Sequence, residues 1–295
     1  MRQEVSQHDS PSPTAISPIG IFDSGLGGLT VVRAIRSLLP AESLIYFGDT
    51  ARVPYGIKSS QTVRRFAHEN VRFLLRFQPK MIVVACNTAS AAAMGELVRH
   101  FDLPVLGVVE PGAARAVELA NGDPIGIVGT EATINSRAYY HAIIRHAPHI
   151  QVYGRACPLL VPLVEEGRSP DDPLVQLVLA EYLEGMLAQP LGALVLGCTH
   201  YPLLKEAFAR IMGSVRHSKR FSIVDSAQET AREVKRRLES LHLEHPKASG
   251  VSVRSPLQCL VSDNPYRFRQ LAQRFLGEAV DLELVSSDDF SGKNS

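Results

Sequence analysis

The segment VVACNTA, Val83–Ala89, decides the fold because the chain contains a near copy of it, LVLGCTH, at Leu194–His200. In both segments a run of apolar residues typical of a buried strand ends at a cysteine and passes into a polar, threonine-containing turn. Two other pairs, IGIF with IGIV and LGVVEP with SIVDSA, recur at offsets between 106 and 116 residues. We interpret this pattern as two similar halves that arose by duplication, and chance similarity between strand–helix units is the alternative.

Strand-like and helix-like segments alternate along both halves. The segments 19–22, 44–47, 81–85 and 105–109 are short and rich in Val, Ile and Leu, and an amphipathic segment, Gln61–Phe77, lies among them. Alternation of strands with helices predicts an α/β fold with parallel sheets. The final strand-like run, Leu257–Val261, and the helix-like Pro265–Leu276 have no counterpart, so they must attach to one half.

Composition and charge exclude several classes of protein. Of the 295 residues 45% are hydrophobic, and the formal net charge is +1, so the chain offers no basic field to a nucleic acid. No apolar run approaches the roughly 20 residues that span a bilayer, so no membrane partner is expected. The polar residues 1–18 and 286–295 are expected to be disordered tails, and residues 1–18 lack the apolar stretch of an export signal. We therefore expect a cytoplasmic protein with reduced cysteines.

Small, polar or nucleophilic residues follow the predicted strands, at the edge where open α/β sheets bind ligands. Each group also precedes a predicted helix, whose first backbone N–H groups suit a substrate carboxylate. These groups are Asp23 and Ser24 in GIFDSGLGG, the segment GDTARVPYG at 48–56, Cys86 with Asn87 and Thr88, and Cys198 with Thr199 and His200.

The glycines of GIFDSGLGG raise the question of a dinucleotide-binding turn. The run Gly25-x-Gly27-x-x-Thr30 lacks the third glycine of that motif, and the acidic residue about 20 positions later does not clearly end a strand. No lysine follows where a phosphate-binding P-loop needs one. The segment is therefore a weak candidate for a nucleotide site.

The four cysteines fall into two groups. Cys157 and Cys259 lie within apolar runs and are expected to be inert, buried thiols. Cys86 and Cys198 each end a strand before a predicted helix, and a helix N-terminus lowers the pKa of a thiol. Two such thiols on opposite faces of one substrate would let one sulfur remove a proton from a carbon while the other delivers one, which inverts a stereocentre. A disulfide between them is the structural alternative.

Three polar side chains could assist these thiols. Asp23, at the neighbouring strand end, could tune Cys86, and His200, two residues beyond Cys198, could tune that sulfur. A turn or helix-capping role for Asp23 and a surface position for His200 are the plain structural alternatives. Glu165, in VPLVEEG, is a weaker candidate because an exposed acidic pair is usually solvated.

Five segments together resemble the signature segments of the glutamate racemase family, in that family's order. They are GIFDSGLGGLTV, GDTARVPYG, VACNTASA, CPLLVPLVEEG and LGCTHYPLL, and the resemblance covers about Ile19 to Leu276. It implies two α/β domains related by a pseudo-twofold axis, 19–112 with 225–285 and 113–224, and an active site in the cleft between them. It also implies that the chain racemises glutamate without pyridoxal phosphate or a metal, supplies D-glutamate for peptidoglycan in the bacterial cytoplasm, and forms a homodimer.

The resemblance also assigns functional residues at the matching positions of this chain. Cys86 and Cys198 would be the proton donors and acceptors, assisted by Asp23 and His200, with Glu165 nearby. The residues that would contact the glutamate substrate are Asp23, Ser24, Tyr55, Gly56, Asn87, Thr88, Thr199 and His200. No cofactor or metal is expected.

Two other functions stay open from the sequence. The cysteine motifs alone would also suit a racemase of the same superfamily that acts on another amino acid, such as aspartate. A redox sensor with a switchable Cys86–Cys198 disulfide is the alternative from another class, although the chain has no C-x-x-C pair.

Overall fold

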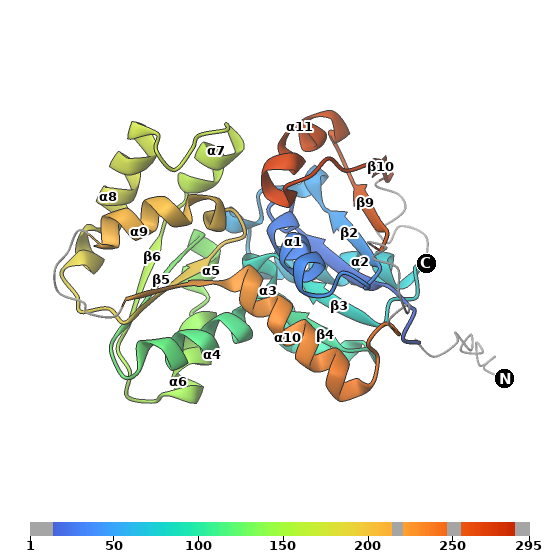
Figure 1. Ribbon diagram of the computed structural model, residues 1–295, viewed down its shortest axis with the longest axis horizontal. Coiled ribbons are helices and arrows are strands. Elements are labelled where there is room, and N and C mark those ends of the chain that lie inside the picture. The colour runs from blue at the N-terminus through green and yellow to red at the C-terminus, as the bar shows by residue number, and fades with distance from the viewer. Residues whose placement is uncertain (1–13, 214–220, 247–254, 287–295) are drawn as a thin grey trace.

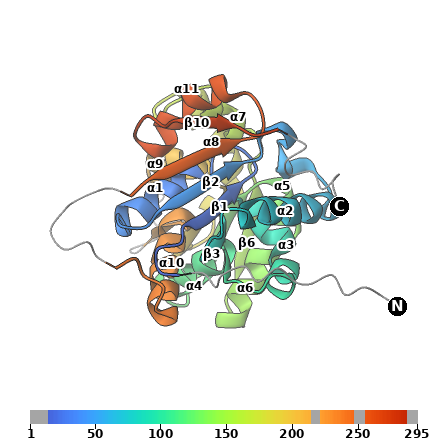
Figure 2. The same cartoon turned by 90° about the vertical axis from the view of Figure 1, so that its right-hand side faces the viewer.

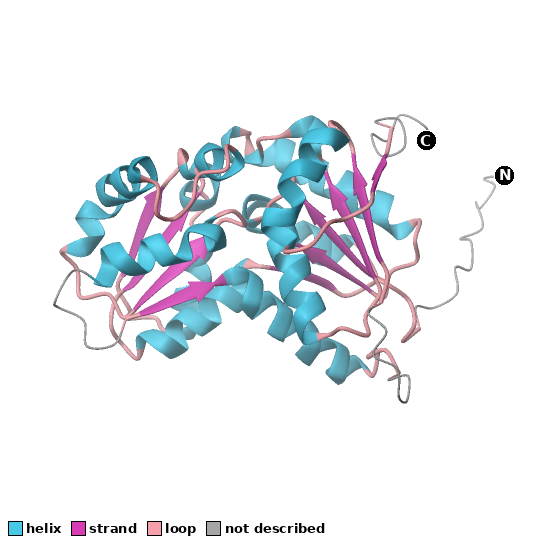
Figure 3. Ribbon diagram, turned by 45° about the horizontal axis from the view of Figure 1, so that its top comes forward, coloured by secondary structure: helices cyan, strands magenta, loops and turns pink. Residues whose placement is uncertain are grey.

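The computed structural model describes residues 14–213, 221–246 and 255–286. Two parallel sheets lie side by side, each covered by helices (Figure 1, Figure 3). The α/β class and the two parallel sheets predicted from the sequence are therefore confirmed. The predicted tails lie almost wholly outside the described residues. The last five residues of the first tail, Thr14–Pro18, are described, and the carbonyl of Ala15 accepts a hydrogen bond from Lys80 Nζ at 2.6 Å.

The two sheets repeat one strand order. The first sheet runs β10-β9-β2-β1-β3-β4 and the second runs β6-β5-β7-β8, with all neighbours parallel. Figure 2 shows β10, β2, β1 and β3 following one another across the first sheet. The order β2-β1-β3-β4 therefore matches β6-β5-β7-β8, which supports the interpretation of two duplicated halves. The strands are β1 (Ile19–Asp23), β2 (Leu44–Gly48), β3 (Met81–Val84), β4 (Val105–Gly107), β5 (Ile125–Gly129), β6 (Val152–Ala156), β7 (Ala193–Gly197), β8 (Ser222–Asp225), β9 (Leu257–Val261) and β10 (Leu282–Leu284).

The unmatched C-terminal unit attaches to the first sheet. Strand β9 pairs with β2, with Leu257 opposite Leu44, and the helix that follows β9 packs on the first helix of the chain. Strand β10 then pairs with β9 and extends the sheet. Because β10 has only three residues, two of them exposed, its sequence carries no strand pattern that could be recognised.

Helices cover both faces of each sheet. On the first sheet α2 and α3 pack on one face, and α1, α10 and α11 pack on the other. On the second sheet α4 and α6 cover one face, and α7, α8 and α9 cover the other. The helices are α1 (Leu29–Leu38), α2 (Ser60–Leu75), α3 (Asn87–His100), α4 (Val109–Ala120), α5 (Glu131–Asn135), α6 (Ala138–His146), α7 (Leu160–Glu165), α8 (Pro173–Leu187), α9 (Lys205–Gly213), α10 (Ser226–Leu241) and α11 (Pro265–Leu276), with short 3₁₀ turns at η1 (Thr50–Arg52), η2 (Tyr55–Ile57) and η3 (Tyr201–Leu204).

The chain crosses between the sheets twice. Helix α4 follows β4 of the first sheet but packs against α6 and β7 of the second, and α10 follows β8 of the second sheet but packs against α1. Residue 112, a predicted domain limit, lies inside α4, and residue 224 lies inside β8. One cluster of buried side chains also runs through both halves, with Ile21 from the first sheet and Leu196 from the second. The two halves therefore share part of their core.

Two predicted element bounds need correction. The strand expected at 105–109 ends at Gly107, and α4 begins at Val109, because Pro111 fits the first turn of a helix, where its missing N–H is not needed. The helix expected at 61–77 spans Ser60–Leu75, since the Ser59 hydroxyl accepts a hydrogen bond from the Thr62 N–H at 3.3 Å and so starts it one residue earlier. Within the described residues, no helix is long and apolar enough to cross a membrane.

Candidate active site

Cys86 lies at the carboxyl end of β3, beside the end of β1. It is the N-cap of α3, and its sulfur accepts a hydrogen bond from the Ala89 N–H at 3.5 Å. Its thiol also lies 3.6 Å from the hydroxyl of Ser24, which follows β1. Because β1 and β3 are paired neighbours, the Asp23–Ser24 turn and Cys86 meet at one edge of the first sheet, as the sequence predicts.

The predicted lowering of the Cys86 pKa is wrong. Burial in the protein, followed by the negative charge of Asp23, raises the pKa of the Cys86 thiol to about 12, although the Ala89 N–H opposes the shift. At this position the effect of desolvation on the thiol pKa is therefore larger than that of the helix N-terminus. Cys86 holds its proton at neutral pH and presents a thiol.

Asp23 is completely buried and only partly hydrogen-bonded. Its Oδ2 accepts the Gly25 N–H at 2.9 Å, as expected of a turn residue, but its Oδ1 is buried without a partner. Burial raises the pKa of the Asp23 carboxyl against the lowering effect of the Gly25 bond. A free acceptor oxygen in this position is available to a positively charged ligand group.

Cys198 follows β7, the counterpart of β3, and leads into a network of three side chains. Its sulfur lies 3.9 Å from Nδ1 of His200, and Nε2 of the same ring lies 3.0 Å from Oε1 of Glu165, the last residue of α7. Phe275 of α11 packs edge-on against the imidazole, with ring centroids 5.2 Å apart. The structure thus brings His200 and Glu165 to Cys198. The alternative of a surface position for His200 is excluded because only 7% of it is exposed.

The charge on His200 is set by its two partners. Burial disfavours the imidazolium, but the hydrogen bonds to Cys198 and Glu165 outweigh burial and raise the pKa of His200 to about 10. Burial also opposes the charged form of Glu165, and the bond to His200 outweighs it, so the pKa of Glu165 is lowered. A positive ring beside the sulfur attracts negative charge there. Cys198 is followed by the 3₁₀ turn η3, not directly by the predicted α-helix, so His200 takes the place of a helix N-terminus as the nearby positive group.

We expect Glu165→Gln to lower the pKa of His200 from about 10 by about 1–2 units, because the variant removes the negative partner of the imidazolium. An NMR titration of the ¹³C-labelled imidazole measures this change. Glu166→Gln is the matched control, since Glu166 pairs with Arg267 at 3.2 Å and has no contact with His200 in the described chain. An unchanged His200 titration in Glu165→Gln would contradict the network.

The turn that begins at Asp23 (the Asp23 turn) packs closely against the turn that begins at Cys198 (the Cys198 turn). A Cβ atom on Gly27 would lie 2.5 Å from His200 Nδ1 and still closer to Thr199 Oγ1. The Thr30 hydroxyl lies 3.1 Å from the carbonyl oxygen of Thr199. These contacts place the turn that follows β1 of the first half against the turn that follows β7 of the second half.

Threonine hydroxyls make a second junction between the halves. Thr88 Oγ1, in the first turn of α3, lies 2.9 Å from Thr130 Oγ1 and 3.3 Å from Thr133 Oγ1, both of which come from the second half. A Cβ atom on Gly56 would lie 2.9 Å from Thr130 Cβ, so the GDTARVPYG loop closes over the same junction. Sequence reasoning missed Thr130 and Thr133. The signal for Thr130 was available, because Thr130 follows β5, the counterpart of β1.

The hydroxyl of Tyr55, in the same loop, is hydrogen-bonded to residues of the first half. The hydroxyl donates to Asp49 and accepts a hydrogen bond from Asn70 Nδ2 at 3.2 Å. Arg52 donates to the same Asp49 carboxylate at 2.7 Å and anchors the loop. The backbone around Gly56 is therefore the part of this loop that lies against the second half, and the Tyr55 hydroxyl holds the loop in place.

Asn87 carries an unused hydrogen-bond donor. Its Oδ1 accepts a bond of 2.7 Å from the Tyr139 hydroxyl, whereas its Nδ2 is buried without a partner. With Asp23 Oδ1, the site therefore contains one free acceptor and one free donor, which suit the ammonium and a carboxylate of an amino acid.

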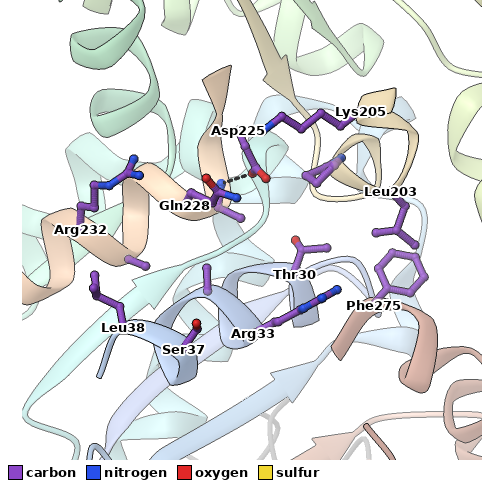
Figure 4. Close-up of a pocket in the computed structure, with 14 residues that line it drawn as sticks. Thr30, Arg33, Ser37, Leu38, Leu203, Lys205, Asp225, Gln228, Arg232 and Phe275 are labelled. Atoms are coloured by element: carbon purple, nitrogen blue, oxygen red, sulfur yellow. Dashed lines mark hydrogen bonds between the residues drawn. The ribbon is translucent and has the colours of Figure 1, made fainter. Parts of the chain in front are cut away.

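Three further observations concern other possible sites. A cavity of about 540 Å³ lies between α1, α9 and α10 and is lined by Arg33, Lys205 and Asp225 among others, but by neither Cys86 nor Cys198 (Figure 4). Cys157 and Cys259 are buried free thiols, as expected. Among the residues that the structure describes, no cluster of three or more His, Cys, Asp or Glu side chains could hold a metal ion.

The chain is similar to known proteins over most of its length. A family model described as Asp/Glu/Hydantoin racemase matches residues 19–258. The chain belongs to this family. The predicted resemblance and the predicted enzyme class are thereby confirmed. The tested part of the fold prediction, two parallel-sheet α/β units, also agrees with the family's solved structures.

Individual members of the family are similar over almost the whole chain. The glutamate racemase of Syntrophus aciditrophicus is 45% identical over 90% of this chain and 94% of its own length. The crystal structure of glutamate racemase from Thermus thermophilus, in complex with β-chloro-D-alanine, has a TM-score of 0.82 at 46% identity and covers 94% of this chain and 99% of that one. The Francisella tularensis glutamate racemase structure, in complex with D-glutamate, has a TM-score of 0.84 at 37% identity and covers 94% and 100%.

Proposed function

We propose that this family member interconverts L- and D-glutamate, with Cys86 and Cys198 as the two acid–base groups. The observation that supports the proposal is the packing of the segment after β1, which holds Gly27 and Thr30, against Thr199 and His200. Strand β1 is the neighbour of β3, at whose carboxyl end Cys86 lies, and Thr199 directly follows Cys198. Each cysteine comes from a different half, so each reaches a bound amino acid from its own side.

The polar groups of the site suit an amino acid with two carboxylates. The free Oδ1 of Asp23 accepts a hydrogen bond from the α-ammonium, and the free Nδ2 of Asn87 donates to a carboxylate. Ser24, Gly56, Thr88, Thr199 and Thr130 supply further hydroxyl or backbone groups. Glutamate is the substrate we favour over aspartate, because the relatives that match at 45–48% identity are glutamate racemases.

In this proposal the two cysteines exchange roles between the two directions of the reaction, and they start with different charges. The Cys198 sulfur, beside protonated His200, removes the α-proton, and the Cys86 thiol delivers its own proton to the opposite face of the carbanion. Cys198 then carries the proton and Cys86 the negative charge, which is the starting arrangement for the reverse reaction. One proton is taken up and one is released in each direction.

Three wider roles go with this activity. We propose that the product D-glutamate serves peptidoglycan synthesis, that the protein acts in the cytoplasm, and that it forms a homodimer. Gel filtration with light scattering measures the last of these. The domains are proposed as 19–112 with 225–285 and 113–224, so that the cysteines belong to different domains.

Incubation of the purified protein with L-glutamate in D₂O tests the proposed function. We expect D-glutamate to appear with deuterium at the α-carbon, in the presence of chelator and without added pyridoxal phosphate, measured by chiral chromatography and mass spectrometry. Racemisation with the original α-hydrogen retained would contradict the two-base mechanism. Faster conversion of L-aspartate would point to the alternative substrate. A reversible Cys86–Cys198 disulfide without any racemisation would favour a redox sensor.

A further inference from the structure

Tyr139 of α6 connects the second half to the residue that follows Cys86. Its hydroxyl donates to Asn87 Oδ1 at 2.7 Å, and Asn87 is the first residue of α3 in the first half. Neither the sequence motifs nor the proton transfer described above uses Tyr139. The proton transfer therefore does not explain the role of this hydrogen bond.

The buried ring of Tyr139 occupies space that two glycines leave open. Only 2% of the residue is exposed. A Cβ atom on Gly112 would lie 3.4 Å from its Cε1, and one on Gly197, immediately before Cys198, would lie 3.1 Å from its Cε2. Burial also raises the pKa of the Tyr139 hydroxyl, so the group keeps its proton and acts as a donor throughout the neutral and mildly alkaline range.

The direction of this hydrogen bond shows which end of the Asn87 amide is left free. An asparagine amide has one acceptor oxygen and one donor nitrogen, and rotation about its last bond exchanges them. Because Tyr139 donates to Oδ1, Nδ2 must point the other way, where it is buried without a protein partner. An oxygen in that place would repel a carboxylate, whereas the amide nitrogen attracts one.

We propose that Tyr139 is a positioning residue that orients Asn87 so that its Nδ2 binds a substrate carboxylate. The proposal rests on the proposed function, since glutamate supplies that carboxylate. Tyr139 belongs to the second half and Asn87 to the first. The carboxylate contact is therefore complete only when α3 and α6 pack together so that the hydrogen bond between these residues forms.

Tyr139→Phe keeps the ring and removes the hydroxyl. We expect KM for both glutamate enantiomers to rise about tenfold, which is the effect of one weakened hydrogen bond to a charged group, and kcat to change by less than about threefold. A rise in KM with little change in kcat marks a loss of binding shared by substrate and transition state. Tyr140→Phe, the next residue on the same helix, is the control and should leave both constants unchanged. An unchanged KM in Tyr139→Phe would overturn the proposal.

A double-mutant cycle shows whether Tyr139 acts through Asn87. In an Asn87→Ala background, Tyr139→Phe should have almost no further effect on KM, because the amide that it orients is absent. An equal effect of Tyr139→Phe in both backgrounds would mean that the hydroxyl acts independently of the Asn87 amide, and would overturn the proposal. Thermal unfolding of each variant identifies a loss of folded protein.

A measurement without substrate separates this proposal from the proposed function. With ¹⁵N-labelled asparagine, the side-chain amide signals of Asn87 are identified by their loss in Asn87→Ala. We expect these signals to shift and to exchange with solvent faster in Tyr139→Phe, and not in Tyr140→Phe. Unaltered signals overturn the positioning role even if glutamate is racemised. If the signals are altered but the protein does not racemise glutamate, the positioning role of Tyr139 is kept and the proposed racemase activity is rejected.

Discussion

Cys86→Ala and Cys198→Ala should each lower kcat/KM for glutamate racemisation by about a thousandfold or more, because each removes one of two groups that act as a unit. The loss should be equal in both directions, since the two enantiomers have the same free energy and the equilibrium constant is one. Chiral chromatography of reactions started from each enantiomer measures both rates. The effect is chemical and not structural, so Cys86→Ser and Cys198→Ser, which preserve shape, should be impaired as well.

Cys157→Ala and Cys259→Ala are the matched controls for the cysteine prediction. Both thiols are buried like the other two, but Cys157 donates to the carbonyl of Arg155 at 3.6 Å and Cys259 lies inside β9, so neither caps a helix as Cys86 does. We expect both variants to retain most activity when folded. A Cys157→Ala variant as inactive as Cys86→Ala, with native thermal stability, would show that the catalytic assignment is wrong.

Gly27→Ala should lower kcat/KM by about a hundredfold, because a displacement of about 1 Å in a catalytic site has an effect of that size. The new methyl group would overlap both Thr199 and His200, which are buried and held by their own hydrogen bonds. The Asp23 turn and the Cys198 turn would have to separate, which moves the two sulfurs apart. Steady-state kinetics measures the loss.

Gly185→Ala is the control for this glycine. Gly185 lies in α8, and a Cβ atom there would have no neighbour within 4 Å, so activity should be unchanged and the helix slightly more stable. If Gly27→Ala were as active as the native protein, the close approach of the two turns would not be required for catalysis, and the argument for one joint site would fail.

Much of the site was predictable because strand ends are local features. The apolar runs before Cys86 and Cys198 predict β3 and β7, and parallel strands place their carboxyl ends at one edge of a sheet. Asp23 follows the neighbouring strand β1 for the same reason. Repetition of the pattern indicated two halves, and the shared strand order agrees with it.

Other residues around these groups could not be found in this way, because the residues that they contact lie far away in the sequence. Thr133 and Tyr139 reach Thr88 and Asn87 from positions 45 and 52 residues further along the chain. Phe275 comes from the C-terminal unit that returns to the first sheet and reaches His200. Glu165 was the weaker candidate of the sequence, as one half of an acidic pair, and only the fold places it 3.0 Å from the imidazole.

The sequence by itself determined the places of Cys86 and Cys198 at equivalent strand ends, because hydrophobic periodicity and turn residues act over a few positions. The tertiary structure alone decided their charges and partners. The pKa of Cys86 rises to about 12 although it caps a helix, and that of His200 rises to about 10 although it is buried. Desolvation and charge pairing depend on every group that surrounds an atom, and folding brings those groups together from distant parts of the chain.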